Sequence, residues 1–459
     1  MHPAPLLLLA GAALVAGCAS VAPEDALSEA TRHAARAGAP APRLLDPAAQ
    51  AAERERLLQQ PLDDATAVRL ALLTSPAAQA LLADGWRAQV DTARSASWPR
   101  LGLGVERVRG DGVTQWTRTL SIGLAELVTL PLRRADAERR TQVQRLALAR
   151  ELLSLHARVR QQWVRAVAAR QQASYREQVL DLAEAGAEMA RRLQQVGNWS
   201  RLQRSREELF ELDARAQLTR ARAAAQAESE ALVRLLGLDA AQARELRWPG
   251  HLDAPPPRAP VAQEIGEAAL RERLDLQLAG AEWSAATGAP AWATLVDAEL
   301  ALHRERGSDG ERARGTELEL QLPLGAEAAL RCDARDAAAH AAAQRLQQAR
   351  IEAQSLLRER VAAVEAARAI SRQYREQLLP LRQQITQDQL LRYNGMLGSV
   401  FTLLADARAQ VDAVIGALDA DRDHWLAQVA LDAAILGVPA AGTTPQAVTA
   451  ASTEPKGGH

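Results

Sequence analysis

The chain has 459 residues, of which 3% are aromatic, and its formal net charge is −1 with a pI near 6.7. So few aromatic side chains are unusual for large globular cores and favour long helices that pack through Ala and Leu. Near-neutral charge gives no electrostatic reason to expect nucleic acid as a partner, because a basic face is the minimum requirement for that class.

The first 17 residues read as a signal peptide. Their apolar run, Leu6–Ala16, is too short to span a bilayer but has the length of a signal-peptide core. LVAGC (14–18) resembles the lipobox of bacterial lipoproteins, in which the Cys is acylated and becomes residue one. The segment before it lacks Lys and Arg, so a plain signal peptide remains the alternative. Ala19 is not the Asp that holds lipoproteins at the inner membrane in enteric-type bacteria, so an outer membrane anchor at Cys18 is expected.

After an extended tether expected at 18–64, one pattern occurs twice, at 65–244 and 263–438, on either side of a proline-rich linker at 245–262. A flexible tail is expected at 439–459. Two pairs of segments align with the same offset of 198: SPAAQALLADGW (75–86) with RLDLQLAGAEWS (273–284), and LQQVGNWSRLQ (193–203) with LRYNGMLGSVF (391–401). This alignment makes Gly395 the second copy of Gly197, each a break within a helical segment.

Each repeat begins with a helix of about 20 residues that leads into two short runs of alternating apolar and polar residues. Strands are expected near 99–108 and 117–130 in the first repeat, and near 292–303 and 316–323 in the second. The connections at 109–116 and 304–315 are rich in glycine and charge. Each pair of strands therefore reads as a hairpin with an exposed loop.

A long helical stretch follows each hairpin. From Arg133 to Gly197 an unbroken helix would extend roughly 95 Å at 1.5 Å per residue, more than a globular domain needs. Its apolar residues recur at helical steps, as coiled-coil helices require. They are Leu148, Leu152, Leu155, Val159, Trp163 and Val167, and Leu378, Leu381 and Ile385 repeat the pattern in the second copy. Pro380 is expected to kink or reset that second helix.

The alternating strands suit a barrel with lipid outside and water inside. Four strands cannot close into a pore, and an open edge in lipid would cost several kcal/mol for each unpaired backbone group. Closure therefore requires several chains: eight strands from two or twelve from three. A soluble protein whose hairpins pack on its own helices remains the alternative.

Taken together, the lipobox, the duplicated halves, the strand pair ending in LPL, the turns VGNWSRLQRSREEL and YNGMLGSVFTLLADARAQ and the terminal LG resemble the TolC-type outer membrane factor family. The resemblance covers about 65–438. It implies a mainly α fold with a small β part: long antiparallel coiled-coil helices forming an α-barrel tunnel, and four strands per chain in a homotrimeric, 12-stranded transmembrane β-barrel. It also implies a periplasmic adaptor and an inner membrane efflux pump as partners, outer membrane lipid around the barrel, and passive conduction.

The same resemblance assigns the two turns to the periplasmic tip where the adaptor docks. The matching residues are Val196, Gly197 and Ser200 in the first turn, and Tyr393, Gly395 and Gly398 in the second. Trp199 is a candidate adaptor contact or an intramolecular packing residue. Acidic residues that narrow the entrance in some family members are not matched, since Phe401 and Thr402 stand there and Asp406 is the nearest acid.

If Leu, Ile and Val face lipid, the alternation along each strand predicts that five carboxylates per chain face the lumen. They are Glu106, Asp297, Glu299, Glu317 and Glu319. Arg107 lies on the other face of its strand. An acidic lumen favours cationic cargo, such as metal ions or basic drugs. A hydrophilic lining without selectivity is the alternative. Trp98, Trp116 and Trp292 lie near strand ends and are candidates for an interfacial aromatic belt.

Other classes find less support. The eight His residues are scattered, and the sequence has no His-Glu-x-x-His motif, no Cys pair for zinc and no nucleophile elbow, so no enzyme activity, metal or cofactor is expected. Cys332 reads as a small apolar residue. A periplasmic adaptor has one helical hairpin, whereas this chain has two equivalent turns. A lipid-anchored coiled-coil scaffold without a pore has no use for lipid-facing strands.

Overall fold

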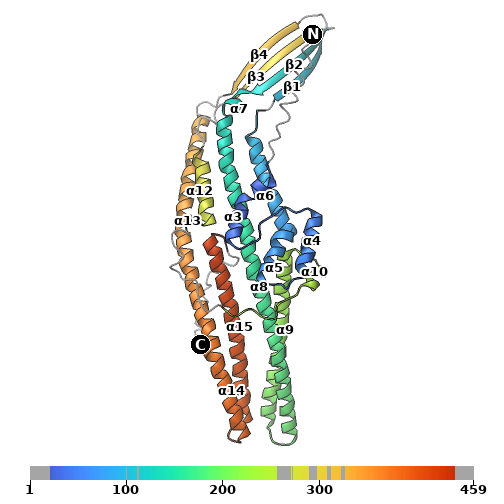
Figure 1. Cartoon of the computed structure of the whole chain (residues 1–459), viewed down its shortest axis with the longest axis vertical. Helices are drawn as coiled ribbons and strands as arrows, with labels where there is room; N and C mark the ends of the chain where they lie inside the picture. The colour runs from blue at the N-terminus through green and yellow to red at the C-terminus, as the bar shows by residue number, and fades with distance from the viewer. Residues whose placement is uncertain are drawn as a thin grey trace, which may run out of the picture. The chain divides into compact units, whose positions relative to one another are not determined.

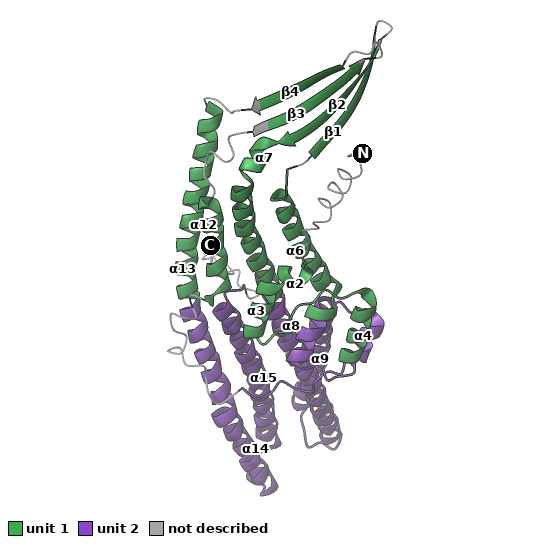
Figure 2. Ribbon diagram, turned by 45° about the horizontal axis from the view of Figure 1, so that its top comes forward, with its two compact units in different colours: residues 1–57, 72–152, 265–356 green, residues 58–71, 153–264, 357–459 purple. Residues whose placement is uncertain are grey.

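The computed structural model describes residues 21–99, 101–110, 113–255, 270, 272–288, 297–307, 312–321 and 326–439. The chain divides into two compact units (Figure 2). The first is Met1–Leu57, Leu72–Leu152 and Ile265–Leu356, and the second is Leu58–Ala71, Leu153–Glu264 and Leu357–His459. Each unit thus combines segments from both halves of the duplicated sequence.

The first unit contains a four-stranded antiparallel sheet in the order β1-β2-β3-β4 (Figure 1). The strands are β1 (Leu101–Gly110), β2 (Val113–Gly123), β3 (Asp297–Gly307) and β4 (Arg312–Gln321). Each repeat supplies one hairpin, and the two hairpins pair through β2 and β3. In the part of the chain that the structure describes, the outer edges of β1 and β4 pair with no further strand.

The expected strand boundaries need correction. The strand expected at 117–130 is Val113–Gly123, because Leu124–Val128 forms the short helix α7. The strand expected at 316–323 begins earlier, at Arg312, and the charged connections at 109–116 and 304–315 are mostly strand. Arg occupies every second position at three of the hairpin ends, at 107 and 109, at 304 and 306, and at 312 and 314, and this spacing keeps a period of two. Of the strand expected at 292–303, residues 292–296 lie outside the described residues.

The segment expected to be an extended tether, 18–64, is helical instead over most of its described part. It forms α2 (Pro23–Ala26), α3 (Ser28–Arg36) and α4 (Pro47–Leu58). The physical reason is burial: Ala26, Leu27 and Ala30 are almost inaccessible to solvent. Hydrogen bonds from the side chains of Trp86 and Gln89, both in α6 (Pro76–Ser95), to backbone carbonyls of this segment also fix it.

Two helices run through both units, α8 (Leu130–Gln195, 66 residues) and α13 (Ala326–Gln373, 48 residues). The first unit also holds α12 (Leu274–Thr287). The second unit adds α5 (Asp64–Arg69), α9 (Arg201–Leu236), α10 (Ala240–Glu245), α14 (Leu379–Asn394) and α15 (Val400–Leu436). Among the described residues no single helix is long and apolar enough to cross a membrane, although Asp64–Thr74 and Pro76–Ser95 would pass together as a bent pair.

The ends of these helices follow from local chemistry. Asp63 caps α5 by accepting a hydrogen bond from the backbone N–H of Thr66. Both α9 and α15 end at a glycine in the left-handed conformation, Gly237 with φ 69° and Gly437 with φ 74°. Leu236-Gly237 and Leu436-Gly437 therefore end their helices with the same kind of cap.

The apolar pattern expected along α8 is confirmed at five of its six positions, and Trp163 is half-buried. Leu148, Leu152, Leu155, Val159 and Val167 are all less than 9% exposed. In the second unit, Ala183, Ala187 and Ala190 are also buried, and such small side chains let neighbouring helices approach closely. In contrast, Leu381 in the second copy is 56% exposed in the single chain.

Pro380 resets its helix as expected. The π-helical turn η4 (Tyr374–Leu378) ends two residues before it, and α14 continues from Leu379. Proline has no N–H to donate to the carbonyl four residues earlier, and a π turn absorbs that interruption. Gly416 of α15 packs here, where an added Cβ would lie 2.7 Å from the Tyr374 ring. Only glycine fits this close approach.

Residues 245–255 contain no helix beyond the end of α10, as the expected linker at 245–262 requires, but they are packed. Leu252 is buried in a cluster with Val164, Val167 and Ala168, against which Trp248 and Trp425 pack. The indole N–H of Trp425 donates to the carbonyl of Asp253 at 2.9 Å. Residues 256–262 of the linker and 440–459 of the tail lie outside the described residues.

Candidate functional site

The sheet has two chemically different faces, which we call the leucine face and the carboxylate face. Because side chains alternate along a strand, residues paired across the sheet share a face. Two cross-strand rows on the leucine face are almost entirely apolar: Leu101, Ile122, Leu300 and Leu318, then Leu103, Leu120, Leu302 and Thr316. Five of these leucines are exposed in the single chain, from Leu120 at 39% to Leu103 at 79%. Such a surface requires cover by lipid or protein.

The five carboxylates expected to share a face do so by register. Glu299 pairs with Glu319, and Glu106, Glu317 and Asp297 have the same parity, opposite to the leucines. Sequence reasoning missed a sixth, Glu305, because it was assigned to a loop. Its parity with Glu299 would have identified it once the strand was extended.

A small hydrogen-bonded cluster lies on the carboxylate face. His303 Nε2 is 2.8 Å from a carboxylate oxygen of Glu317, and its Nδ1 is 3.0 Å from the Thr119 hydroxyl. Gln115 donates to Glu305 at 2.8 Å. Polar contacts of this kind are typical of a water-exposed surface, so the carboxylate face suits water and the opposite leucine face suits an apolar environment. The described residues contain no group of three or more His, Cys, Asp or Glu arranged to hold a metal ion.

In the second unit, the two tip turns connect α8 to α9 and α14 to α15, over residues 196–200 and 395–399. Each helix before a turn ends in the same pattern of two backbone hydrogen bonds. Asn198 donates to Leu193 and Gly197 to Gln194 in the first turn, as Leu397 donates to Arg392 and Met396 to Tyr393 in the second.

This geometry corrects the sequence alignment at the turns. Gly197 has φ 80°, and the residue in the corresponding left-handed position is Met396 with φ 59°. Gly395 is in an ordinary conformation with φ −81°. Likewise Ser200 and Ser399 cap the following helices, so the turns correspond at an offset of 199, one more than the alignment assumed. Only the first glycine, therefore, is required for the backbone to reverse.

Replacing Gly197 with Ala should lower the free energy of unfolding by about 1 kcal/mol, because an L-residue is strained at positive φ. A methyl group there meets nothing within 4 Å, so backbone strain is the only cost. Met396→Gly should raise stability by up to about 1 kcal/mol. Guanidinium unfolding followed by circular dichroism measures both.

Gly395→Ala is the matched control and should be nearly neutral, because its added Cβ makes contacts no closer than 3.4 Å. A loss at Gly395 as large as that at Gly197 would contradict the correspondence of Gly197 with Met396.

The remaining expected tip residues take different roles. Ser200 forms a capping box with Gln203, and Gly398 precedes the Ser399 cap. Trp199 is half-buried, and its ring stacks on Phe401 with centroids 4.7 Å apart, so it joins the two turns. Around them, four apolar side chains are exposed: Val196 at 70%, Tyr393 at 42%, Met396 at 94% and Leu397 at 79%. The tip turns thus carry an apolar patch.

A charged contact also joins the two helical hairpins, one residue from α9 and one from α15. Arg408 donates to the Glu207 carboxylate at 2.6 Å, and its guanidinium lies 4.3 Å from the centre of the Phe210 ring. Glu207 is only 4% exposed, whereas the Arg408 side chain is 34% exposed. Sequence reasoning did not find this pair, since its members are 201 residues apart.

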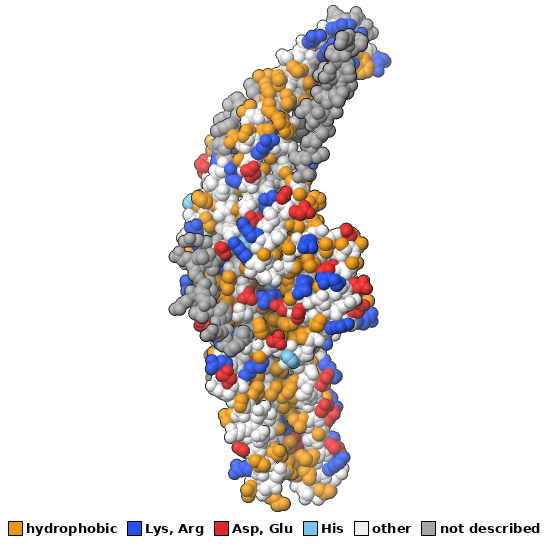
Figure 3. All heavy atoms as spheres, viewed as in Figure 1, with side chains coloured by type: hydrophobic (Ala, Val, Ile, Leu, Met, Phe, Trp, Pro, Cys, Tyr) orange, Lys and Arg blue, Asp and Glu red, His pale blue; other side chains and the backbone are white. Residues whose placement is uncertain are grey.

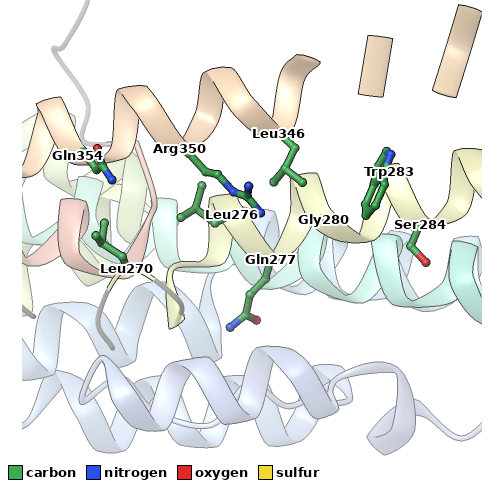
Figure 4. Close-up of a pocket in the computed structure, with 9 residues that line it drawn as sticks. All are labelled: Leu270, Leu276, Gln277, Gly280, Trp283, Ser284, Leu346, Arg350 and Gln354. Atoms are coloured by element: carbon green, nitrogen blue, oxygen red, sulfur yellow. The ribbon is translucent and has the colours of Figure 1, made fainter. Parts of the chain in front are cut away.

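The first unit contains a pocket of about 560 Å³. It is lined by Leu270, by Leu276, Gln277, Gly280, Trp283 and Ser284 of α12, and by Leu346, Arg350 and Gln354 of α13. Figure 4 shows Arg350 and Leu346 directed from α13 towards α12. Its described lining contains one charged side chain, Arg350, and one hydroxyl, that of Ser284.

Other expected sites lie apart from these. Cys18 and Trp292 are outside the described residues. Trp98 is 69% exposed just before β1. Trp116 lies within β2, is 42% exposed, and the Arg107 guanidinium stands 5.2 Å from the centre of its ring.

No protein-family model matches the sequence, and no curated protein does. Solved structures, however, share its fold. The outer membrane protein VceC from Vibrio cholerae is 16% identical, with a TM-score of 0.65 over 84% of this chain and 97% of that chain. The CmeC outer membrane channel of Campylobacter jejuni is 13% identical, with a TM-score of 0.65 over 84% and 86% of the two chains.

The open state of the Neisseria gonorrhoeae MtrE outer membrane channel is similar as well, at 17% identity and a TM-score of 0.60 over 83% of this chain and 90% of that chain. The chain therefore has the fold of the TolC-type outer membrane channels, with long helices and a small antiparallel sheet, as the resemblance implied.

Proposed function

We propose that this protein is the outer membrane channel of an export system. Three copies would join their sheets into a closed twelve-stranded barrel, with the leucine face towards lipid and the carboxylate face towards water. The long helices would continue the conduit through the periplasm. Cargo would cross it by diffusion, without chemistry or a cofactor.

The observation that supports this most is the sheet itself. Its two faces differ in the way that a barrel wall requires, and both outer edges are unpaired among the described residues. An unpaired edge in lipid is expensive, because no water is present to satisfy its N–H and C=O groups. Pairing β4 of one copy with β1 of the next removes that cost. The exposed Leu381 would likewise be covered by another subunit.

The test is assembly and conduction together. The full-length protein, extracted in mild detergent, should migrate as a trimer that separates into monomers on heating. In planar lipid bilayers it should produce discrete conductance steps. A protein that stays monomeric and leaves the bilayer silent would contradict the proposal. So would a conducting dimer, because it would leave eight strands rather than twelve.

We further propose that the tip turns receive a periplasmic adaptor, which couples the channel to an inner membrane pump. The exposed Val196, Tyr393, Met396 and Leu397 would supply the apolar contact, with Trp199 holding the turns together. Cys18 would carry the lipid anchor at the outer membrane. Cross-linking from Met396 in cells tests the contact, and mass spectrometry of the mature N-terminus tests the acylation.

The carboxylate face should make the channel prefer cations. In asymmetric KCl, the wild type should show a K⁺ to Cl⁻ permeability ratio above one. A variant with Glu106→Gln, Glu305→Gln and Glu317→Gln should bring that ratio down towards one. The matched control replaces Glu327, Glu352 and Glu359, three exposed residues of α13, with Gln. An anion-selective reversal potential in the wild type would refute the acidic lumen.

A further inference from the structure

The leucine face changes character towards the hairpin turns. The cross-strand row after Leu103 and Leu120 is Val105, Arg118, Arg304 and Arg314, and the next is Arg107, Trp116, Arg306 and Arg312. Two apolar rows are thus followed by two rows that hold six arginines. Figure 3 shows hydrophobic side chains over the lower part of the sheet and Arg side chains at its upper, hairpin end.

These arginines share one face, and no carboxylate of the described strand residues lies on that face. The carboxylates at the same level, Glu106 and Glu305, have the opposite parity. All six guanidinium side chains are exposed, and none forms a salt bridge with any carboxylate of the described residues. The Arg107 guanidinium stacks near Trp116 instead.

Such a pattern is unfavourable in isolation. Arg304 pairs directly with Arg118 and Arg314, and Arg306 with Arg312. Directly opposed side chains on one face lie about 5 Å apart at Cβ, where like charges repel. Closing the sheet against a second copy would place β1 beside β4 and extend the same rows. Since no described carboxylate neutralises these rows, anions from outside the protein would stabilise the face.

The position of the rows identifies the anion. Arginines that directly follow an apolar band lie at headgroup level if that band faces lipid, with their aliphatic stems along the acyl boundary. Guanidinium groups bind phosphate oxygens in bidentate fashion. We propose that the two arginine rows bind the phosphate groups of anionic lipids in the leaflet nearest the hairpin turns. This inference rests on the proposed function, because it requires the leucine face to be in lipid.

The experiment uses the full-length protein in nanodiscs of phosphatidylcholine, with bis-phosphorylated lipid A as the probe and native mass spectrometry as the readout. The wild type should retain lipid A at least tenfold better than added phosphatidylcholine. A variant with Arg304→Gln, Arg306→Gln, Arg312→Gln and Arg314→Gln should lose at least tenfold of that retention. A variant with Arg→Lys at the same four positions should keep more of it, since the charge remains.

The matched control removes four exposed arginines from the helices, Arg331, Arg345, Arg358 and Arg372, and should bind lipid A as the wild type does. Equal retention by the wild type and the four-Gln sheet variant would overturn the inference. Conductance of the same protein preparations, measured in planar lipid bilayers, distinguishes failure of the lipid site from failure of the channel proposal. A silent wild type refutes the channel, whereas a conducting wild type with no preference for lipid A refutes only the lipid site.

Discussion

Replacing Arg408 with Ala should lower the free energy of unfolding by about 3 kcal/mol. The reason is the uneven burial of its ion pair. Glu207 is 4% exposed and would remain in the interior without its partner, which is the situation in which loss of an ion pair costs most. The cation–π contact with Phe210 would be lost too.

Removing the charge of the other partner, Glu207, should lower the free energy of unfolding by less. In Glu207→Gln the remaining Arg408 is 34% exposed, so water can solvate its charge. We therefore expect an asymmetry, with Arg408→Ala clearly more destabilising than Glu207→Gln. Guanidinium titration at neutral pH measures both. Arg372→Ala is the control, because its pair with Glu376 lies within one helical segment and both side chains are more than half exposed, so its loss should cost well under 1 kcal/mol.

The same pair should affect conduction if the proposed channel is right. Arg408 of α15 donates to Glu207 of α9, so this ion pair connects the two helical hairpins within about ten residues of the tip turns. Releasing it should increase the fraction of time that single channels spend in a high-conductance state. Unchanged conductance in a variant that is measurably destabilised would show that the pair has a structural role only.

Acid should destabilise the protein through His156, the second large effect. This side chain of α8 is 7% exposed, and its Nδ1 has no hydrogen-bond partner among the described residues. Burial, together with the nearby positive charge of Arg160, lowers the pKa of His156 to about 4, against a partial opposing effect of Asp432. Arg160 itself is held by ion pairs at 2.9 Å to Asp64 and to Asp432.

The direction of this pH effect follows from the number of protons that the folded and unfolded chains bind. Between pH 6.5 and about 4 the unfolded chain binds a proton at His156 and the folded chain does not, so stability falls as the pH falls through that range. The full loss is about 3 kcal/mol, and about 2 kcal/mol of it should be lost between pH 7.5 and 5. His156→Gln should be less sensitive to pH by that amount over the same interval.

His424 should contribute separately to the pH dependence of stability. It is 2% exposed, and burial, followed by the charge of Arg368, also lowers its pKa. The double variant with His156→Gln and His424→Gln should flatten the pH dependence further than either single change. Unfolding titrations at the two pH values decide this, and identical slopes for wild type and double variant would contradict it.

Much of the architecture could be predicted from periodicity. Five of the apolar residues predicted along α8 are buried because a helix places every third or fourth side chain on one side, wherever that side later packs. Leucines and carboxylates occupy opposite faces of the sheet for the same kind of reason, since parity along a strand is a local property. The duplicated pattern likewise anticipated two hairpins and two helical turns.

Tertiary structure decided what depends on partners distant in the sequence. The tether became helical because its apolar residues are buried, and the strands continued through charged ends because neighbouring strands pair with them. The full length of β3 placed Glu305 on the carboxylate face, and only the register brought six arginines from four strands into two rows. Met396 adopts the left-handed backbone conformation in the second turn. Trp199 packs on Phe401, and Glu207 pairs with Arg408, each about 200 residues away in the sequence. Local sequence sets which side of an element a residue occupies, but not which element will lie against it.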